Sequence, residues 1–596
     1  MKFWGFLPGL AATALVLAAI ALTGQSAAPP PETLLRLRNL GKAFYENPTT
    51  QAQAVDQFKR ALELNPKSTA DRLNYGLALL RAGRSAEGIA ELEAVQKIDP
   101  SLPHTWFNLG IEYKKRGETA RAIQQLEQMA KLVPGEPITH YNLGVLFKAD
   151  GKQKEANAKF TLAARLDPNF AAPHFQLFNF YRQSGDQTHA RAELALFQDL
   201  KNRHEESGAG NEDVEWCSYS EVYDPIDAAL SAAPAPPAAL SFASTALPGK
   251  FPAANTSLHV IDLDGTGSSD LLVVSTTGMT VFRKGLTPVP QPALASVTGI
   301  LAAIPGDYDN DGLVDLCVLT TTGPILFHNT RTGFQESSIN LPAGRYETAV
   351  WLDYDHDYDL DLLLLGATTT LLRNQLPQGF AERTADIPFV TGKALSAAVT
   401  RIIPDTKSHD LVITYADRPA VLYKDRLGGK YEPSSLAAVP SGATALLSAD
   451  LDNDSFPDLI WSSGAALNRD GAVTSVPWQP RGSFALADLE SRGLLDVLAS
   501  DGFYRNNAQG RFTATQNATG LPSGSITLAA ADFDADGRTD LALLLPDGTL
   551  HRCLNRTSLR SNWSRIHLNG VKNLKLAPGA EVEIKAGALY QKLFYR

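Results

Sequence analysis

A nine-residue acidic motif in the second half of the chain constrains the fold more than any other feature of the sequence. Its fullest form reads Asp-x-Asp-x-Asp-Gly-x-x-Asp and runs directly into a short apolar segment, as at 307–319 and 532–544. The motifs start 45, 46, 97, 38 and 44 residues apart, and the interval of 97 contains a degenerate unit that keeps only Asp405 and Asp410. A unit of about 45 residues therefore recurs seven times between 241 and 558.

Each unit continues with short segments that read as β-strands. A basic residue followed by Asn precedes a Gly-Phe pair, as at 328–334 and 373–380, and an apolar-Pro pair ends the unit, as at 341–342. Short strands at this period are typical of propeller blades. The last unit lacks its closing segment, and residues 241–248 have the sequence of one. We predict a seven-bladed β-propeller in which 241–248 form the outer strand of the last blade, which leaves no free sheet edge.

This repeat resembles the FG-GAP, or VCBS, family, which is known for calcium-binding loops in seven-bladed propellers such as the integrin head. The resemblance covers residues 241–558. It implies a propeller whose acidic loops hold calcium and whose surface binds protein or glycan partners.

The chemistry of the acidic loops favours the same ion. Four carboxylates within nine residues repel one another and raise their own pKa values unless a cation lies between them. Oxygen ligands at positions 1, 3 and 5, a glycine at 6 and a carbonyl at 7 suit Ca²⁺ rather than Zn²⁺. An EF-hand is excluded because position 12 is Val318 or Leu543 rather than glutamate, and a strand follows. The alternative is that the aspartates only cap turns.

The loops differ in how completely they match the motif. Four loops carry all four carboxylates, although Tyr358 occupies the glycine position of one of them, and the first loop carries three. In the loop at 488–496 the cation of Arg492 would replace a metal, so turn capping is a plausible alternative there and in the degenerate unit, and metal occupancy of both stays open. His356 occupies a side position and is expected to face solvent. We predict about four to five structural Ca²⁺ sites. Their candidate ligands are Asp262, Asp264, Asp270, Asp307, Asp309, Asp311, Asp315, Asp353, Asp355, Asp357, Asp361, Asp450, Asp452, Asp454, Asp458, Asp532, Asp534, Asp536 and Asp540.

A second repeat, of 34 residues, occupies residues 33–205. Its units share a closing proline, a small residue twelve positions earlier, and an apolar stripe that is clearest at 106–113. The repeat resembles the tetratricopeptide repeat, a helix–turn–helix unit of this length. About five units are predicted, and the fifth, at 174–197, lacks the glycine and the proline and is expected to cap the stack. The closing prolines are Pro66, Pro100, Pro134 and Pro168.

The tetratricopeptide resemblance implies a scaffold. Stacked helix pairs curve into a superhelix whose concave face suits an extended peptide or a partner helix. Aromatic residues of the repeat, such as Trp106, are expected to pack in the core rather than to form a ligand cage. We therefore predict protein or peptide partners on the concave face.

Residues 206–240 are expected to link the two repeat regions. An aromatic cluster of Trp216, Tyr219 and Tyr223 surrounds Cys217, and a spacer rich in Ala and Pro follows it. The cluster is either a recognition peptide or a segment that packs against a neighbouring domain, and packing is favoured.

Residues 1–28 indicate export. Lys2 precedes an apolar run from Phe3 to Leu22, and Ser26 and Ala28 suit a peptidase that removes the segment. A run of about 20 apolar residues could also remain as a single membrane anchor. Either alternative places the rest of the chain outside the cytoplasm, in the periplasm, at the cell surface or in the medium.

Residues 559–596 contain two further predicted strands, at 562–570 and 577–587. Together they resemble the start of an ASPIC/UnbV domain, which often follows such propellers in cartilage acidic protein-like sequences. The chain is either a fragment, or its tail docks on the propeller. A fragment is favoured because a lone strand pair is marginally stable.

Composition and the remaining motifs limit the function. A formal charge of −10, from 64 acidic and 54 basic side chains, argues against binding nucleic acid or an anionic membrane surface. Three cysteines cannot form a disulfide framework. The sequence contains no P-loop, zinc-protease, serine-hydrolase or dithiol motif.

The sequence therefore predicts a multidomain α + β protein, with an α-solenoid, a seven-bladed β-propeller and a partial C-terminal β module. The predicted function is an exported, non-catalytic binding scaffold that meets a membrane only through its N-terminal segment. The alternative is an enzyme with its active site at the central channel of the propeller, which the fold alone neither supports nor excludes.

Overall fold

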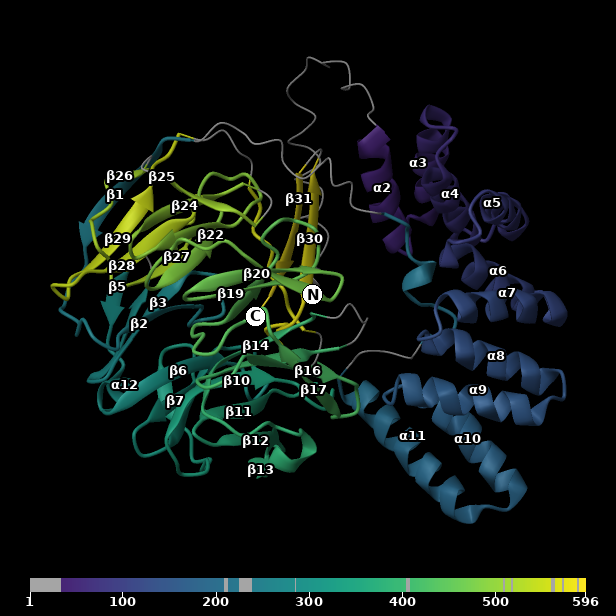
Figure 1. Cartoon of the computed structure of the whole chain (residues 1–596), viewed down its shortest axis with the longest axis horizontal. Coiled ribbons are helices and arrows are strands. Elements are labelled where there is room, and N and C mark those ends of the chain that lie inside the picture. Colours follow the sequence, from purple (N-terminus) through teal and green to yellow (C-terminus); the bar gives the residue numbers. More distant parts are fainter. Residues whose placement is uncertain are drawn as a thin grey trace, which may run out of the picture. The chain divides into compact units, whose positions relative to one another are not determined.

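The computed structural model describes residues 34–207, 213–224, 238–283, 286–402, 408–507, 510–515, 518–558, 563–570, 573–586 and 589–595. This part of the chain contains a region of helical repeats, a seven-bladed β-propeller and a further two-stranded sheet (Figure 1). The predicted fold class is confirmed. The predicted export segment and Asp405 lie outside the described residues, in which no helix is both long and apolar enough to cross a bilayer.

The 34-residue repeat folds into successive helix pairs. In four of the five described pairs the chain reverses at a glycine with positive φ, such as Gly117 (φ 73°) and Gly151 (φ 75°). The paired helices approach closely, because a Cβ atom on Gly144 would lie 2.6 Å from the ring of Phe160. The described helices are, in pairs, α2 (Leu34–Glu46) and α3 (Gln51–Leu64), α4 (Thr69–Arg81) and α5 (Ser85–Ile98), α6 (Pro103–Lys115) and α7 (Thr119–Leu132), α8 (Pro137–Ala149) and α9 (Gln153–Leu166), and α10 (Ala171–Ser184) and α11 (Gln187–Ser207).

Each of the first six propeller blades is a four-stranded antiparallel sheet whose strands follow chain order (Figure 1). The second strand of a blade is buried on both faces. In blade 1, Leu272 packs with Leu316 of blade 2, whereas its neighbour Leu271 packs with Ala542 of blade 7. This double burial explains the uninterrupted apolar run after each acidic motif.

The strands of these six blades have the following bounds. They are β2 (Ser257–Ile261), β3 (Asp270–Ser275), β4 (Gly278–Arg283) and β5 (Thr287–Val289); β6 (Ile300–Gly306), β7 (Asp315–Thr320), β8 (Pro324–Asn329) and β9 (Phe334–Glu336); β10 (Tyr346–Leu352), β11 (Asp361–Gly366), β12 (Thr369–Asn374) and β13 (Phe380–Glu382); β14 (Ala394–Thr400), β15 (Asp410–Tyr415), β16 (Ala420–Asp425) and β17 (Tyr431–Leu436); β18 (Leu447–Ala449), β19 (Asp458–Trp461), β20 (Gly464–Arg469) and β21 (Ala472–Val476); β22 (Phe484–Ala487), β23 (Asp496–Ala499), β24 (Gly502–Asn506) and β25 (Phe512–Thr515). Short helical turns are η1 (Ser218–Ser220), α12 (Pro292–Ala295) and η2 (Thr384–Asp386).

The seventh blade joins the two ends of the propeller sequence. Its outer strand pairs antiparallel with the last strand of the blade, so that Phe242 lies opposite Asn555. The prediction that 241–248 supply this strand is confirmed. A two-residue strand at 518–519, which follows blade 6 in the chain, pairs parallel with the same outer strand. The sheet consists of β26 (Ala518–Thr519), β1 (Leu240–Ala246), β29 (Leu550–Asn555), β28 (Asp540–Leu544) and β27 (Thr527–Ala531), in that spatial order.

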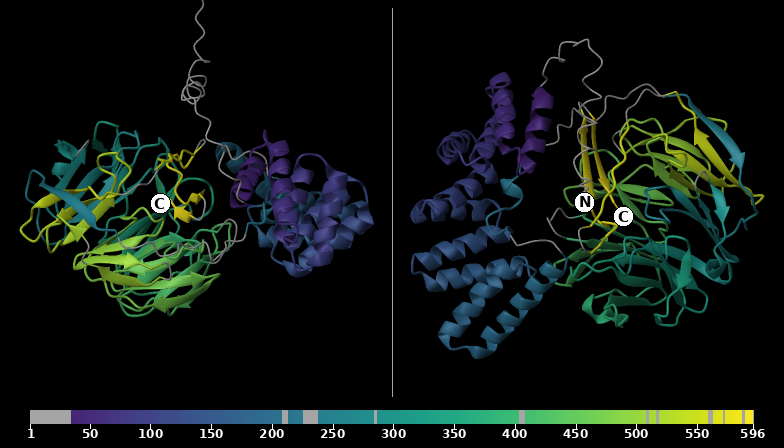
Figure 2. Two further views of the ribbon diagram at one scale, coloured as in Figure 1. Left: turned by 90° about the horizontal axis from the view of Figure 1, so that it is seen from above. Right: turned by 180° about the vertical axis from the view of Figure 1, so that it is seen from behind.

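The C-terminal residues form one hairpin, β30 (Glu581–Ala586) and β31 (Leu589–Phe594), beside the propeller (Figure 2). The strand predicted at 562–570 is wrong, because residues 563–570 contain no strand and Arg565 there pairs with Asp532 of a propeller loop.

The tail also contacts other blades. The Leu574 N–H donates to Asn310 Oδ1 at 2.6 Å, and Arg401 Nη1 lies 2.9 Å from Glu581 Oε1. The described tail therefore docks on the propeller, the alternative that the sequence did not favour.

Candidate metal-binding loops

Every acidic motif connects the first and second strands of a blade. The ninth residue of the motif is the first residue of the second strand, and its carboxylate is fully buried. The buried ninth residues are Asp270, Asp315, Asp361, Asp410, Asp458, Asp496 and Asp540.

The first aspartate of each motif caps the loop. Asp307 accepts hydrogen bonds from the N–H groups of Asp311 at 3.1 Å and Gly312 at 3.0 Å. The equivalent pairs of bonds recur in the other loops that keep the motif. Turn capping therefore does occur, but a carboxylate oxygen that accepts one hydrogen bond keeps a lone pair for a cation.

Left-handed backbone at the sixth position gives the loops a common shape. Gly312 (φ 87°) and Gly537 (φ 83°) adopt it without a steric penalty. Tyr358 (φ 69°) and Ser455 (φ 78°) adopt the same conformation at the same position in two other loops. The loops without the glycine thus keep the turn that brings the carboxylates together.

The carboxylates converge at distances that suit a calcium ion. Oxygens on opposite sides of Ca²⁺ are about 5 Å apart, and one oxygen from each residue of a cluster lies within 4.8 Å of the others. Asp355 Oδ1 and Asp452 Oδ1 are buried and accept no hydrogen bond from the described residues. Such oxygens are suited to bind a cation. The clusters among the described residues include Asp262, Asp264 and Asp270; Asp307, Asp309 and Asp311; Asp309 and Asp315 with a ring nitrogen of His328; Asp353, Asp355, Asp357 and Asp361; and Asp450, Asp452 and Asp458.

Several of the other predicted ligands pair with arginines. Asp454 pairs with Arg469, which also reaches Asp452. In the loop at 532–540, Arg556 lies 3.2 Å from Asp534 and 3.3 Å from Asp536, and Arg538 also pairs with Asp536. Asp532 caps the loop as its counterparts do, and Asp540 accepts the N–H groups of Phe533 and Asn555.

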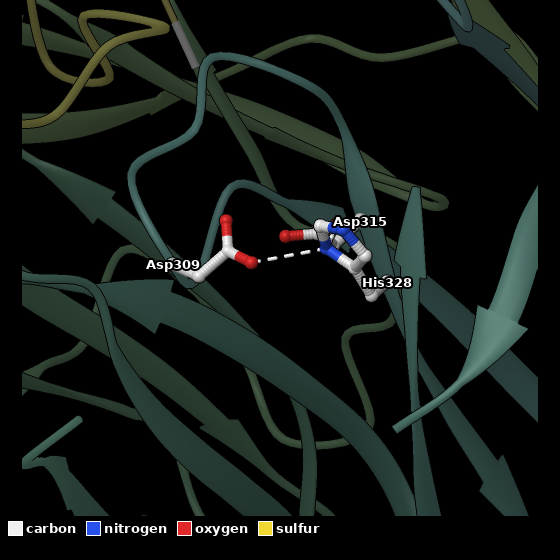
Figure 3. Close-up of side chains that lie close together, drawn as sticks. All are labelled: Asp309, Asp315 and His328. Atoms are coloured by element: carbon white, nitrogen blue, oxygen red, sulfur yellow. Dashed lines mark ion pairs between the residues drawn. The ribbon is translucent and has the colours of Figure 1, made fainter. Parts of the chain in front are cut away.

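A basic residue from the third strand of the blade reaches several of the clusters. His328 Nδ1 lies 3.0 Å from Asp309 Oδ2 and 3.4 Å from Asp315 Oδ1 (Figure 3). Arg373 pairs with Asp355 at 2.9 Å and with Asp357 at 2.7 Å. The sequence reasoning did not assign these residues to the loops. The sequence signal that could have identified them is the basic residue directly before Asn in their repeats.

Comparison with known families agrees with both repeats. Residues 52–103 and 107–169 match the tetratricopeptide repeat family, and residues 262–318, 307–364 and 488–543 match the FG-GAP-like repeat family. The chain carries both kinds of repeat. Such repeats indicate a protein-interaction scaffold and are typically non-catalytic. The ASPIC/UnbV resemblance of 559–596 stays a prediction.

No curated protein matches the chain. Among solved structures, a crystal structure of MamA is 17% identical, covers 28% of this chain and 96% of its own, and has a TM-score of 0.26. A MamA structure that begins at its residue 41, from Desulfovibrio magneticus RS-1, is 17% identical, covers 29% of this chain and 97% of its own, and has a TM-score of 0.27.

Burial raises the pKa of several carboxyl groups in these loops, and the neighbouring aspartates raise it further. The pKa reaches about 9 for Asp315 and Asp458, about 8 for Asp353 and about 7 for Asp450. Without a cation, several of these groups hold a proton near neutral pH. A bound Ca²⁺ ion would favour their ionised form and displace that proton.

These shifts predict how stability depends on pH in metal-free protein. A carboxyl whose pKa is higher in the folded than in the unfolded chain stabilises the fold at low pH, and this contribution disappears as pH rises through the folded pKa. We expect the melting temperature in a chelator to fall between about pH 4 and pH 9. With excess calcium the fall should be much smaller, so the gap between the two melting curves widens with pH. A gap that narrows with pH would contradict this.

One FG-GAP loop carries its own cation. Arg492 Nε lies 2.6 Å from Glu490 Oε2, and its Nη2 lies 2.5 Å from Asp496 Oδ1. Arg505 Nε also lies 2.7 Å from Glu490. Two carboxylates of this loop thus pair with two guanidinium groups, and Arg492 supplies the cation that the sequence predicted. At 353–361, by contrast, Arg373 pairs with two of the four carboxylates at the ligand positions.

Arg492→Asp is expected to convert this loop into a calcium-dependent one. The substitution removes the buried cation and supplies a carboxylate at the fifth position, so the metal-free variant should lose about 3 kcal/mol or more of unfolding free energy. Calcium should restore most of that loss. Urea unfolding with calcium and with chelator measures both effects, and Arg511→Asp makes the same charge change at an exposed position of the same blade. Equal losses in calcium and in chelator would contradict the expectation.

The expectation that His356 faces solvent is wrong. Its side chain is only 13% exposed, and its Nε2 lies 2.7 Å from Asp425 Oδ2 of the next blade. His356 is the fourth residue of the loop and has a left-handed backbone (φ 59°), which directs its side chain toward the neighbouring blade. At that position Asn310 donates to Asp359 at 2.7 Å, and Asn453 donates to the Gly493 carbonyl at 2.8 Å.

A buried asparagine at the end of the third strand joins neighbouring blades. Asn374 Nδ2 donates to the carbonyl of Tyr308 in the preceding loop at 2.7 Å and to that of Leu360 in its own loop at 3.2 Å. The Asn374 N–H also donates to Asp361 Oδ1 at 2.8 Å. We call this asparagine the blade latch. The same bonds to both loops recur at Asn329, Asn468 and Asn506.

Proposed function

We propose that this protein is an exported, non-catalytic interaction scaffold, in which calcium braces the propeller and the helical repeats bind a protein or peptide partner. Two kinds of interaction repeat in one chain support the scaffold. Both kinds are typically non-catalytic, which supports the absence of an enzymatic role.

The calcium proposal is carried by the cluster of Asp353, Asp355, Asp357 and Asp361. These four carboxylates lie within ligand distance of one another, and Arg373 pairs with Asp355 and Asp357. Arg203 and His356 lie near enough to act on Asp355 and Asp353, but neither forms an ion pair with them among the described residues. Arg373 leaves part of the negative charge of the ionised carboxylates unbalanced. A divalent cation would balance it, because a buried charge without a partner costs several kcal/mol. In such a site Ca²⁺ would tie the loop to the second strand of the blade. The chain itself positions the ligands through the capped first aspartate and the buried ninth one.

Export and the partners form the remainder of the proposal. The apolar run from Phe3 to Leu22 supports export, with the N-terminal segment either removed or kept as an anchor. Calcium concentrations outside the cytoplasm suit loops of modest affinity. Protein or glycan partners on the propeller and protein or peptide partners on the helical repeats fit a role at a cell surface, in the periplasm or in the medium.

Affinity capture from the native exported fraction tests this function. The full chain is used as bait, once in calcium and once in chelator. A partner retained in both conditions is expected to bind the helical repeats, and a partner lost in chelator is expected to bind the propeller. Failure of the mature chain to appear outside the cytoplasm, or capture of no specific partner in either condition, would contradict the proposal.

A further inference from the structure

A segment of the presumed linker lies against the tetratricopeptide helices. Residues 213–224, which we call the docked segment, contact α6 and α8 through their backbone. Asn108 Nδ2 donates to the Tyr219 carbonyl at 2.8 Å, and Asn142 Nδ2 donates to the Val214 carbonyl at 2.7 Å. The two asparagines are 34 residues apart, so they occupy the same position in successive repeats.

A charged contact accompanies these backbone contacts. Lys114 Nζ lies 2.7 Å from Glu215 Oε1, and Lys115 Nζ lies 3.5 Å from Glu215 Oε2. Lys114 also donates to Asn142 Oδ1 at 2.6 Å, which orients the amide that holds Val214. The helices therefore bind the main chain at two points and one acidic side chain between them.

Part of the docked segment is buried. Cys217 is 8% exposed and Ser220 is 1% exposed. The chain makes a tight turn there, in which the Ser220 N–H donates to the Cys217 carbonyl at 2.8 Å. The sequence favoured packing over a role as a recognition peptide for the segment around this aromatic cluster. These contacts show that the segment packs against the helices.

Bonds from side-chain amides to peptide carbonyls do not depend on the sequence of the bound peptide, whereas a lysine pair selects a carboxylate. We propose that the surface of α6 and α8 bearing Asn108, Lys114 and Asn142 is a binding site for an extended acidic peptide of a partner protein, and that the docked segment occupies it in cis. This inference rests on the proposed scaffold function and adds the partner class and its regulation. The partner must displace residues 213–224 before it binds.

A tethered ligand competes at a high effective concentration. Tethering within one chain gives effective concentrations of about millimolar, so a partner peptide should bind the native chain about tenfold to a thousandfold more weakly than a chain with an open site. The docked segment then acts as a built-in competitor that only a well-matched partner overcomes.

The test uses the full chain with residues 213–224 replaced by a Gly/Ser segment of equal length. The probe is a fluorescent synthetic peptide with the sequence of residues 213–224. We expect it to bind the replaced chain at least about tenfold more tightly than the native chain. In the replaced chain, Lys114→Glu should weaken binding about tenfold or more, and Lys154→Glu, at an exposed position of α9, should leave it unchanged. Equal binding to native and replaced chains, or an equal effect of both lysine variants, would overturn the inference.

Thiol labelling gives a second measurement that needs no added peptide. Cys217 in the native chain should react at least about a hundredfold more slowly than in urea, and Lys114→Glu should speed the reaction. Labelling of native Cys217 as fast as in urea would overturn cis occupancy. If the replaced and native chains capture an exported partner equally well while the labelled peptide binds neither, the inference fails but the scaffold function stands.

Discussion

Removing calcium from the full chain is expected to lower the melting temperature of the propeller by about 15–20 °C. Each site that is occupied at a hundredfold excess over its Kd contributes about 2.7 kcal/mol to stability, and four to five sites are predicted. Differential scanning calorimetry with calcium and with chelator measures the shift. The helical repeats contain none of the predicted ligands, so their transition serves as an internal reference.

Single substitutions assign the effect to particular loops. Asp355→Asn and Asp452→Asn alter the buried carboxylates whose Oδ1 atoms accept no hydrogen bond within the described chain. Each should lower the bound calcium, counted by metal analysis, by about one ion. Asp417→Asn makes the same chemical change at an exposed residue paired with Arg418 and should leave the count unchanged. Purified native chain with no bound calcium and no melting shift would contradict the metal prediction.

Removing a blade latch is expected to cost about as much stability as emptying one calcium site. Asn374→Ala leaves the buried carbonyls of Tyr308 and Leu360 without their side-chain donor, and an unsatisfied buried polar group costs about 1–3 kcal/mol. We therefore expect a loss of about 3 kcal/mol in unfolding free energy from urea titration. Gln375→Ala, at the exposed neighbouring residue, is the matched control and should cost less than about 0.5 kcal/mol.

The calcium dependence of this loss separates the latch from the metal ligands. Asn374 bonds to backbone carbonyls and to Asp361 only through its N–H, so the loss should be similar in calcium and in chelator. A loss that vanishes in chelator would show that the asparagine acts through the metal site instead.

The features that could be predicted from the sequence are those that repeat locally. The nine-residue motif fixed the positions of the second strands, and the missing tail of the last unit identified the closing strand. Arg492 was predictable because it stands at a ligand position of the motif and pairs with Asp496 four residues away.

The features that escaped prediction depend on contacts between blades. Asn374 and Tyr308 are 66 residues apart, and His356 and Asp425 are 69 residues apart. A periodic pattern shows that such residues recur, but only the curvature of the ring brings them together. The strand predicted at 562–570 failed for a related reason, because alternation alone does not supply a neighbouring strand.

The origin of the closing strand has a consequence for synthesis. Strand β1 leaves the ribosome before any blade, yet its partner β29 is made last, and Ser244 and His551 in their hydrogen bond are 307 residues apart. Closing a loop of that length costs only about 2 kcal/mol more than closing one of thirty residues. The time between the synthesis of β1 and that of β29 therefore matters more than the entropy lost in closing the loop. Until residue 555 is made, β1 lacks its antiparallel partner, so the helical repeats can be complete before the propeller ring closes.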